Sequence, residues 1–119
     1  MRRAARTDDN HTEIIGAFKA MGCSVSDTSR QGEGFPDIAV GFKGCYGPVT
    51  VLVEIKDGAK TPSKKRLRPA QKIWHNDWLG AAAVVESVDQ VAELVNSYRR
   101  GSRPKGRITL SLGAGAGES

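Results

Sequence analysis

The chain has 119 residues and a formal net charge of +5, with 39% hydrophobic and 26% charged residues, which predicts one globular domain able to bury a core without disulfide bonds. Cys23 and Cys45 form no CxxC pair and only two histidines are present, which argues against a zinc site and predicts free thiols in a reducing compartment. Neither a signal peptide nor a run of transmembrane length is present, so we expect a cytoplasmic protein without membrane contact.

Helical periodicity predicts a first helix from Asp8 to Met21. Ile14, Ile15 and Phe18 recur on one face, and Gly22 supplies a stop.

A short strand beginning at Val25, a loop over residues 29–36 and a hairpin should follow. Apolar residues alternate over 38–42 and recur over 49–56, and the connection 44–48 contains glycine and proline, so these two strands should pair antiparallel. The glycines of the loop allow a ligand to approach the backbone closely.

The second half of the chain should alternate helix and strand. After a basic loop over 57–68, Pro69 fits the first position of a helix running to Leu79, and residues 81–85 predict a fourth strand. Ser87-x-x-Gln90 has the spacing of a capping box that opens a third helix. Its inward residues are expected to be Val88, Val91, Ala92, Leu94, Val95 and Tyr98. The element order predicts an α/β fold with a central mixed β-sheet of about four strands flanked by helices.

The character of the chain changes at Arg99. Residues 1–98 are expected to form the single domain, and residues 99–119 a tail that is first basic and then glycine-rich. Alternating apolar residues over 108–112 could add an edge strand or a dimer contact, and a frayed tail is the alternative.

Basic residues are clustered in three segments that contain 13 of the 18 lysines and arginines and none of the 13 acids. Removing these 13 positive charges from the net charge of +5 leaves −8 for the remainder. The clustered residues are Arg2, Arg3 and Arg6; Lys60, Lys64, Lys65, Arg66 and Arg68; and Arg99, Arg100, Arg103, Lys105 and Arg107. An acidic body with basic loops and ends suits a polyanionic partner, and solvated basic tails are the alternative.

An acid and a lysine interrupt the apolar strand over 49–56. Side chains two apart on a strand share a face, so Glu54 and Lys56 should lie together while Val51 and Val53 pack on the other face. A buried carboxylate is costly unless something neutralises it, and a divalent cation shared with Asp37 would do so.

These side chains match the needs of phosphodiester hydrolysis, which requires a metal ion to activate water and a cation near the nucleophile. Magnesium prefers a site with carboxylates, a backbone carbonyl such as that of Ile55, and several waters. We therefore expect Asp37 and Glu54 to bind Mg²⁺, with Mn²⁺ able to substitute.

With Gly34-Phe35-Pro36-Asp37 and Glu54-Ile55-Lys56 as its two halves, the sequence resembles the PD-(D/E)XK nuclease superfamily. A helix bearing Glu13 precedes this motif and Pro69-Ala70-Gln71 opens the next helix, an order that looks like the VRR-NUC branch and is similar to archaeal Holliday-junction resolvases. The resemblance covers residues 8–98 and implies a restriction-endonuclease-like core.

The resemblance also implies roles for individual residues. Asp37 and Glu54 would ligate the metal, Lys56 would orient or deprotonate the attacking water, Glu13 would complete the metal shell through water, and Gln71 would hold Lys56 or a water. The loop before Pro69 is longer and more basic than the family's usual link, which suggests phosphate contacts. The expected DNA-binding residues are Lys60, Lys64, Lys65, Arg66 and Arg68.

Several alternatives stay open. Glu54 and Lys56 could form a surface ion pair of little value, and Glu13 could cap its helix together with Asn10. Trp74 and Trp78, spaced four apart, could pack in the core or an interface or could stack on bases. The basic loop could be merely solvated.

The function expected from these observations is a magnesium-dependent DNA endonuclease, of viral or mobile-element type by its small size, acting on branched DNA such as a Holliday junction. Symmetric cleavage of a four-way junction requires two active sites, which predicts a homodimer. The alternatives are a catalytically inactive nucleic-acid-binding module, a nuclease acting on flaps, nicks or plain duplex, and a two-carboxylate sugar hydrolase, which the positive charge disfavours.

Overall fold

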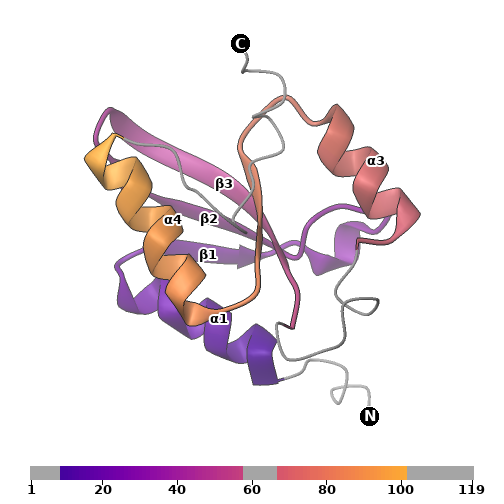
Figure 1. The fold of residues 1–119 in the computed structure, drawn as a ribbon, viewed down its shortest axis with the longest axis horizontal. Coiled ribbons are helices and arrows are strands. Elements are labelled where there is room, and N and C mark those ends of the chain that lie inside the picture. The colour runs from indigo at the N-terminus through magenta and orange to yellow at the C-terminus, as the bar shows by residue number, and fades with distance from the viewer. Residues whose placement is uncertain (1–8, 58–66, 102–119) are drawn as a thin grey trace.

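The computed structural model describes residues 9–57 and 67–101, and confirms the α/β class (Figure 1). Its elements in chain order are α1 (Asp9–Ala20), β1 (Ser24–Asp27), the short 3₁₀ helix η2 (Ser29–Gln31), β2 (Ile38–Gly44), β3 (Gly47–Ile55), α3 (Pro69–Asp77), β4 (Ala82–Val85) and α4 (Val88–Arg100). The four strands form one mixed sheet in the order β1-β2-β3-β4.

The expected hairpin is confirmed and is longer than the alternation indicated. Strands β2 and β3 pair antiparallel from Ile38 opposite Val53 to Gly44 opposite Gly47, where Gly47 has a φ of +122° that favours glycine. Strand β1 pairs antiparallel with β2, and β4 pairs in parallel with β3 after the crossover through α3. The central strand β3 is therefore paired along both of its edges.

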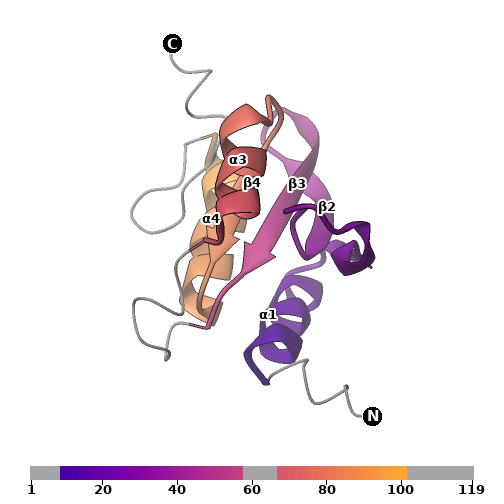
Figure 2. The same cartoon turned by 90° about the vertical axis from the view of Figure 1, so that its right-hand side faces the viewer.

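The hydrophobic core lies between one face of the sheet and helices α1 and α4, which lie together in Figures 1 and 2. From α1 come Ile14 and Phe18, and from α4 Leu94; they pack with Val51 and Val53 of β3, and all five are completely buried. The predicted period-two pattern of β3 therefore places its valines in this core, and its alternate residues point to the opposite face.

Helix α3 lies on the opposite face of the sheet, apart from α1 and α4 (Figure 1). On this side the sheet contributes the buried apolar residues Leu52 and Ala82 and the buried acid Glu54. Helix α3 contributes buried Gln71 and His75. A polar cluster buried at this depth must be held by internal hydrogen bonds, which makes it the place to look for a functional site.

Helix α4 corrects three details of the sequence analysis. It runs through Arg100 to a left-handed Gly101, so the domain extends past residue 98. Arg99 donates a hydrogen bond over 2.8 Å to the backbone oxygen of Met21 and therefore belongs to the folded unit rather than to a tail. Val88, expected to face inward, is 42% exposed because it is the first residue of the helix, before the buried stripe begins at Val91.

The predicted capping box of α4 is only half present. The Ser87 hydroxyl accepts from the backbone N–H of Gln90 over 3.3 Å, but the Gln90 side chain accepts from the N–H of Glu86 rather than from that of Ser87.

Helix α3 ends at Asp77, two residues before the expected end at Leu79. The expected edge strand over 108–112 lies outside the described residues. Within the described ranges, no helix is long and apolar enough to cross a membrane.

Candidate functional site

The loop before β2 carries Asp37 to the end of the sheet. Pro36 is fully buried, its carbonyl oxygen accepts from the Thr28 hydroxyl over 2.8 Å, and the Asp37 carbonyl accepts from the Thr28 N–H over 2.9 Å. The loop thus has a fixed end, and the carboxylate of Asp37 follows directly from it.

Gly34 brings this loop against the start of α3. It has a φ of +84°, and a Cβ placed on it would lie 2.3 Å from the carbonyl oxygen of Ala70. The two backbones can approach this closely only because the position has no side chain. The lack of a side chain at Gly34 therefore allows the loop that carries Asp37 to pack directly against the helix that carries Gln71.

Asp37 is held by the edge of β3. Its Oδ2 accepts a hydrogen bond of 2.8 Å from the backbone N–H of Ile55. The Lys56 N–H points the other way, to Val85 of β4, as the alternation of a strand requires. In a strand the C=O of a residue points to the same edge as its N–H, so the Ile55 carbonyl also faces the side of Asp37.

Glu54 lies beside these groups at 3% exposure. Its Oε2 accepts a 2.7 Å hydrogen bond from Nε2 of Gln71 and lies 3.7 Å from Nζ of Lys56. Its Oε1 is buried and has no hydrogen-bond partner among the described residues. One oxygen of this carboxylate is therefore held by the protein, and the other has no donor; Glu54 can form a hydrogen bond with the Asp37 carboxylate only when it is protonated.

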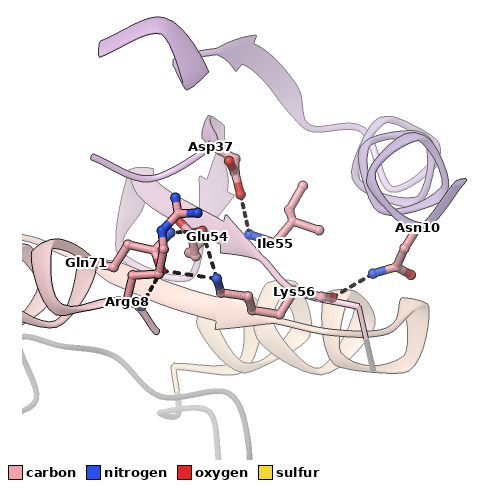
Figure 3. A network of polar contacts seen from close by, with 7 residues as sticks. All are labelled: Asn10, Asp37, Glu54, Ile55, Lys56, Arg68 and Gln71. Atoms are coloured by element: carbon pink, nitrogen blue, oxygen red, sulfur yellow. Dashed lines mark hydrogen bonds and ion pairs between the residues drawn. The ribbon is translucent and has the colours of Figure 1, made fainter. Parts of the chain in front are cut away.

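The amide of Gln71 connects the parts of this network (Figure 3). Its Oε1 accepts from the backbone N–H of Arg68 over 2.8 Å and from Nζ of Lys56 over 3.1 Å. Because a backbone N–H can only donate, this contact requires the amide oxygen to face Arg68 and the NH₂ group to face Glu54. The start of α3 thus sets the direction of both the carboxylate and the lysine.

The environment of Glu54 disfavours its charge. Burial and the negative charge of Asp37 raise the pKa of Glu54 from 4.5 to about 8, against the opposing effect of the Lys56 ammonium. Two neighbouring carboxylates with a single lysine carry more negative charge than this buried place tolerates. A bound divalent cation would remove the imbalance.

Helix α1 supports the site through an unexpected residue. The Asn10 side chain donates to the backbone oxygen of Lys56 over 2.6 Å and to that of Glu86 over 3.4 Å (Figure 3). The alternative in which Asn10 and Glu13 cap the helix is not supported, because Asn10 lies inside α1 and its amide holds the ends of β3 and β4 together.

A cavity of about 330 Å³ opens onto these groups. Asp37, Glu54, Lys56 and Gln71 line it, which brings together four of the five residues expected to be catalytic, and the Ile55 backbone is there too. Glu13 does not line it and is exposed, so the structure does not support Glu13 as a ligand.

His11 lines the cavity in place of Glu13. The sequence analysis missed it, although its spacing of three and seven residues from Ile14 and Phe18 puts it on the inward face of the helix. Of the expected DNA-binding residues, Arg68 lines the same cavity. Lys60, Lys64, Lys65 and Arg66 lie outside the described residues.

The donor set fits a hard divalent cation. Residues 9–57 and 67–101 contain no cluster of three or more His, Cys, Asp or Glu side chains that could hold a metal ion. Mg²⁺ does not need one, because it is commonly bound by one or two carboxylates and keeps several waters. Asp37, the unpartnered oxygen of Glu54 and the Ile55 carbonyl are oxygen donors of this kind.

Comparisons of the chain with protein-family models, curated proteins and solved structures found no match.

Proposed function

We propose that this protein is a metal-dependent DNA endonuclease with a restriction-endonuclease-like core, of the VRR-NUC-like kind that its motif resembles. The observation that supports this most strongly is the unpartnered Oε1 of Glu54, buried beside the Asp37 carboxylate. A surface ion pair with Lys56 would leave neither oxygen buried nor unpartnered, and the Glu54 side chain is only 4% exposed. The arrangement suits a site in which a bound metal ion supplies the positive charge that the side chains lack.

Asp37, Glu54 and the Ile55 carbonyl would hold the ion, which when bound supplies Lewis-acid stabilisation of the phosphate and lowers the pKa of a bound water. The backbone N–H of Ile55 holds Asp37 in place, and the Gln71 amide holds Glu54. Pre-set ligands need little rearrangement when the substrate arrives.

Lys56 would act on the attacking water. Its Nζ donates one hydrogen bond to Gln71 and faces the same cavity as the two carboxylates, so its other N–H groups can orient a water or a phosphate oxygen there. Arg68, at the exposed start of α3, would attract the phosphate on entry.

The proposed substrate is branched DNA, with a homodimer placing two sites on a four-way junction. The clustered basic residues at both ends of the chain and in the loop 57–68 would grip phosphates, which carry no sequence information. Flaps, nicks and plain duplex are the alternative nuclease substrates, and a binding module without catalysis is the alternative function.

End-labelled four-way junctions, flaps, nicked duplexes and linear duplexes of equal length test the proposal, each incubated with Mg²⁺, with Mn²⁺ or with EDTA. We expect cleavage with either metal ion and none with EDTA, and the fastest cleavage on a branched substrate. Binding without cleavage of any substrate under all conditions would favour the inactive binding module. The catalytic site would stand, and the substrate proposal would fail, if linear duplex were cleaved fastest.

A further inference from the structure

A second cavity of about 580 Å³ shares the loop residue Glu33 with the cavity that contains Asp37 and Glu54, called the carboxylate cavity below. The cavity is lined by Glu33, Ala70, Ile73, Trp74, Asp77 and Trp78. The stacking of Trp78 on Trp74, with ring centroids 4.8 Å apart and planes 18° apart, gives this cavity a flat aromatic wall. The rings are not enclosed in the core, because Trp78 is 37% exposed and Ile73 is 63% exposed.

A third aromatic ring packs against the tryptophan pair. Phe35 packs edge-on against Trp74 and Trp78, with centroid distances of 5.2 and 6.4 Å. Phe35 also lines the carboxylate cavity, and Glu33 lines both cavities. The two cavities therefore share one loop as a common wall, and a ligand held in one is adjacent to a ligand held in the other.

The charges of the second cavity select the kind of ligand. Among residues 9–57 and 67–101, the ionisable residues that line it are the acids Glu33 and Asp77, and no described lysine, arginine or histidine does so. These acids disfavour a phosphate here, whereas in the first cavity Lys56, Arg68 and a metal ion bound by Asp37 and Glu54 would offset the acids. A carboxylate only accepts hydrogen bonds when ionised, so the cavity suits a flat ring that carries N–H donors at its edge.

From this arrangement we propose that the Trp74–Trp78 cavity binds a single unpaired nucleobase carrying an exocyclic amino group, next to the phosphate bound in the carboxylate cavity. The inference rests on the proposed nuclease function for the identity of the polymer, and it refines the substrate to DNA with an unpaired nucleotide beside the cleavage point. Cytosine, adenine and guanine have such an amino group, whereas an unpaired thymine has only its ring N–H as a donor and is therefore the weaker match.

The chain offers a direct probe, because Trp74 and Trp78 are its only two tryptophans, so all tryptophan emission reports on this cavity. The wild-type protein is titrated, without added metal, with three single strands of equal length and charge: oligo-dC, oligo-dT and a strand of abasic residues. We expect quenching by oligo-dC, weaker binding of oligo-dT, and an affinity for the abasic strand that is lower than for oligo-dC by about 5- to 150-fold.

Four variants locate the effect. Trp78→Ala should lower the affinity for oligo-dC to that for the abasic strand, and Trp78→Phe should recover part of it. Glu33→Gln combined with Asp77→Asn should reduce the preference for oligo-dC over oligo-dT. Tyr46→Ala removes an aromatic ring that is 90% exposed at the β2–β3 turn, and should bind all three strands as the wild type does.

Equal affinity of the wild type for oligo-dC and the abasic strand, with unchanged tryptophan emission, would overturn the base site. This measurement uses only the wild-type protein, so it does not depend on whether a variant folds. The base site would also be overturned if the emission shifted with protein concentration in the absence of DNA and Ile73→Ser removed this shift. The cavity would then be an interface between two copies of the chain. The two proposals fail separately. Base-dependent quenching without cleavage of any DNA would remove only the nuclease, and cleavage without base-dependent binding would remove only the base site.

Discussion

Gln71 donates a 2.7 Å hydrogen bond to Oε2 of Glu54, so the start of α3 fixes which oxygen of this carboxylate is left for another partner. The oxygen of the same amide, Oε1, accepts from Nζ of Lys56 over 3.1 Å. The positions of the carboxylate and the ammonium are thus coupled through one side chain.

Replacing Gln71 by Met keeps the volume of the side chain and removes these hydrogen bonds. We expect cleavage to slow by roughly 10- to 100-fold, the usual effect of losing a group that orients a metal ligand, while the affinity for DNA stays close to that of the wild type. Asn76→Met, the same amide-to-thioether change on the exposed side of α3, is the matched control and should leave the rate unchanged. An unchanged rate in Gln71→Met would show that the network does not orient the site.

The raised pKa of Glu54 predicts how stability depends on pH in the metal-free protein. Folding raises the pKa from 4.5 to about 8, so between these values the folded state holds a proton that the unfolded state has released. The free energy of unfolding should therefore fall by up to about 1.4 kcal/mol per pH unit as the pH rises through this range. Urea unfolding at several pH values in EDTA measures it. Glu54→Gln should flatten the profile, and a profile equally steep in that variant would assign the effect to other groups.

Magnesium should reverse this loss of stability. The ion and the proton compete for the same carboxylate, so the rise in Tm caused by Mg²⁺ should be small near pH 6 and larger near pH 9. Differential scanning fluorimetry with and without Mg²⁺ tests this for the wild type and Asp37→Asn. A pH-independent shift, or an equal shift in Asp37→Asn, would contradict binding of the ion at these carboxylates.

Gly34 and Gly16 form a matched pair for the close contact between the loop and α3. A Cβ on Gly34 would meet the Ala70 backbone at 2.3 Å, whereas a Cβ on Gly16 would have no atom within 4 Å. Gly34→Ala should destabilise the fold by about 2–4 kcal/mol, and Gly16→Ala, within α1, should stabilise it by about 0.5–1 kcal/mol. Chemical unfolding decides, and a Gly34→Ala variant as stable as the wild type would mean that the loop does not pack against α3 in this way.

Much of the fold follows from the spacing of apolar residues. Alternation over 38–42 and the apolar run over 49–56 predicted the hairpin, and the period of two placed Glu54 and Lys56 on one face. The site residues could be predicted only where their side chains lie on such strands. Helical spacing identifies the buried face of α1 from Ile14 and Phe18. It does not show which residue beside that face lines a cavity formed by distant strands, and for this reason Glu13 was wrongly expected at the site. The contact of Asn10 with Lys56 spans 46 positions in sequence, and no local pattern indicates it.

The central claim is that the carboxylates of Asp37 and Glu54 act through a bound metal ion, and Glu54→Gln tests it most directly. The amide has nearly the shape of the acid and removes only its charge, so folding and DNA binding should persist. The decisive measurement is the single-turnover cleavage rate of a labelled branched DNA in saturating Mg²⁺, together with the Kd for the same DNA, for the wild type and this variant. We expect Glu54→Gln to lose cleavage at an unchanged Kd, and a variant that cleaves near the wild-type rate would show that these carboxylates do not act through a bound ion.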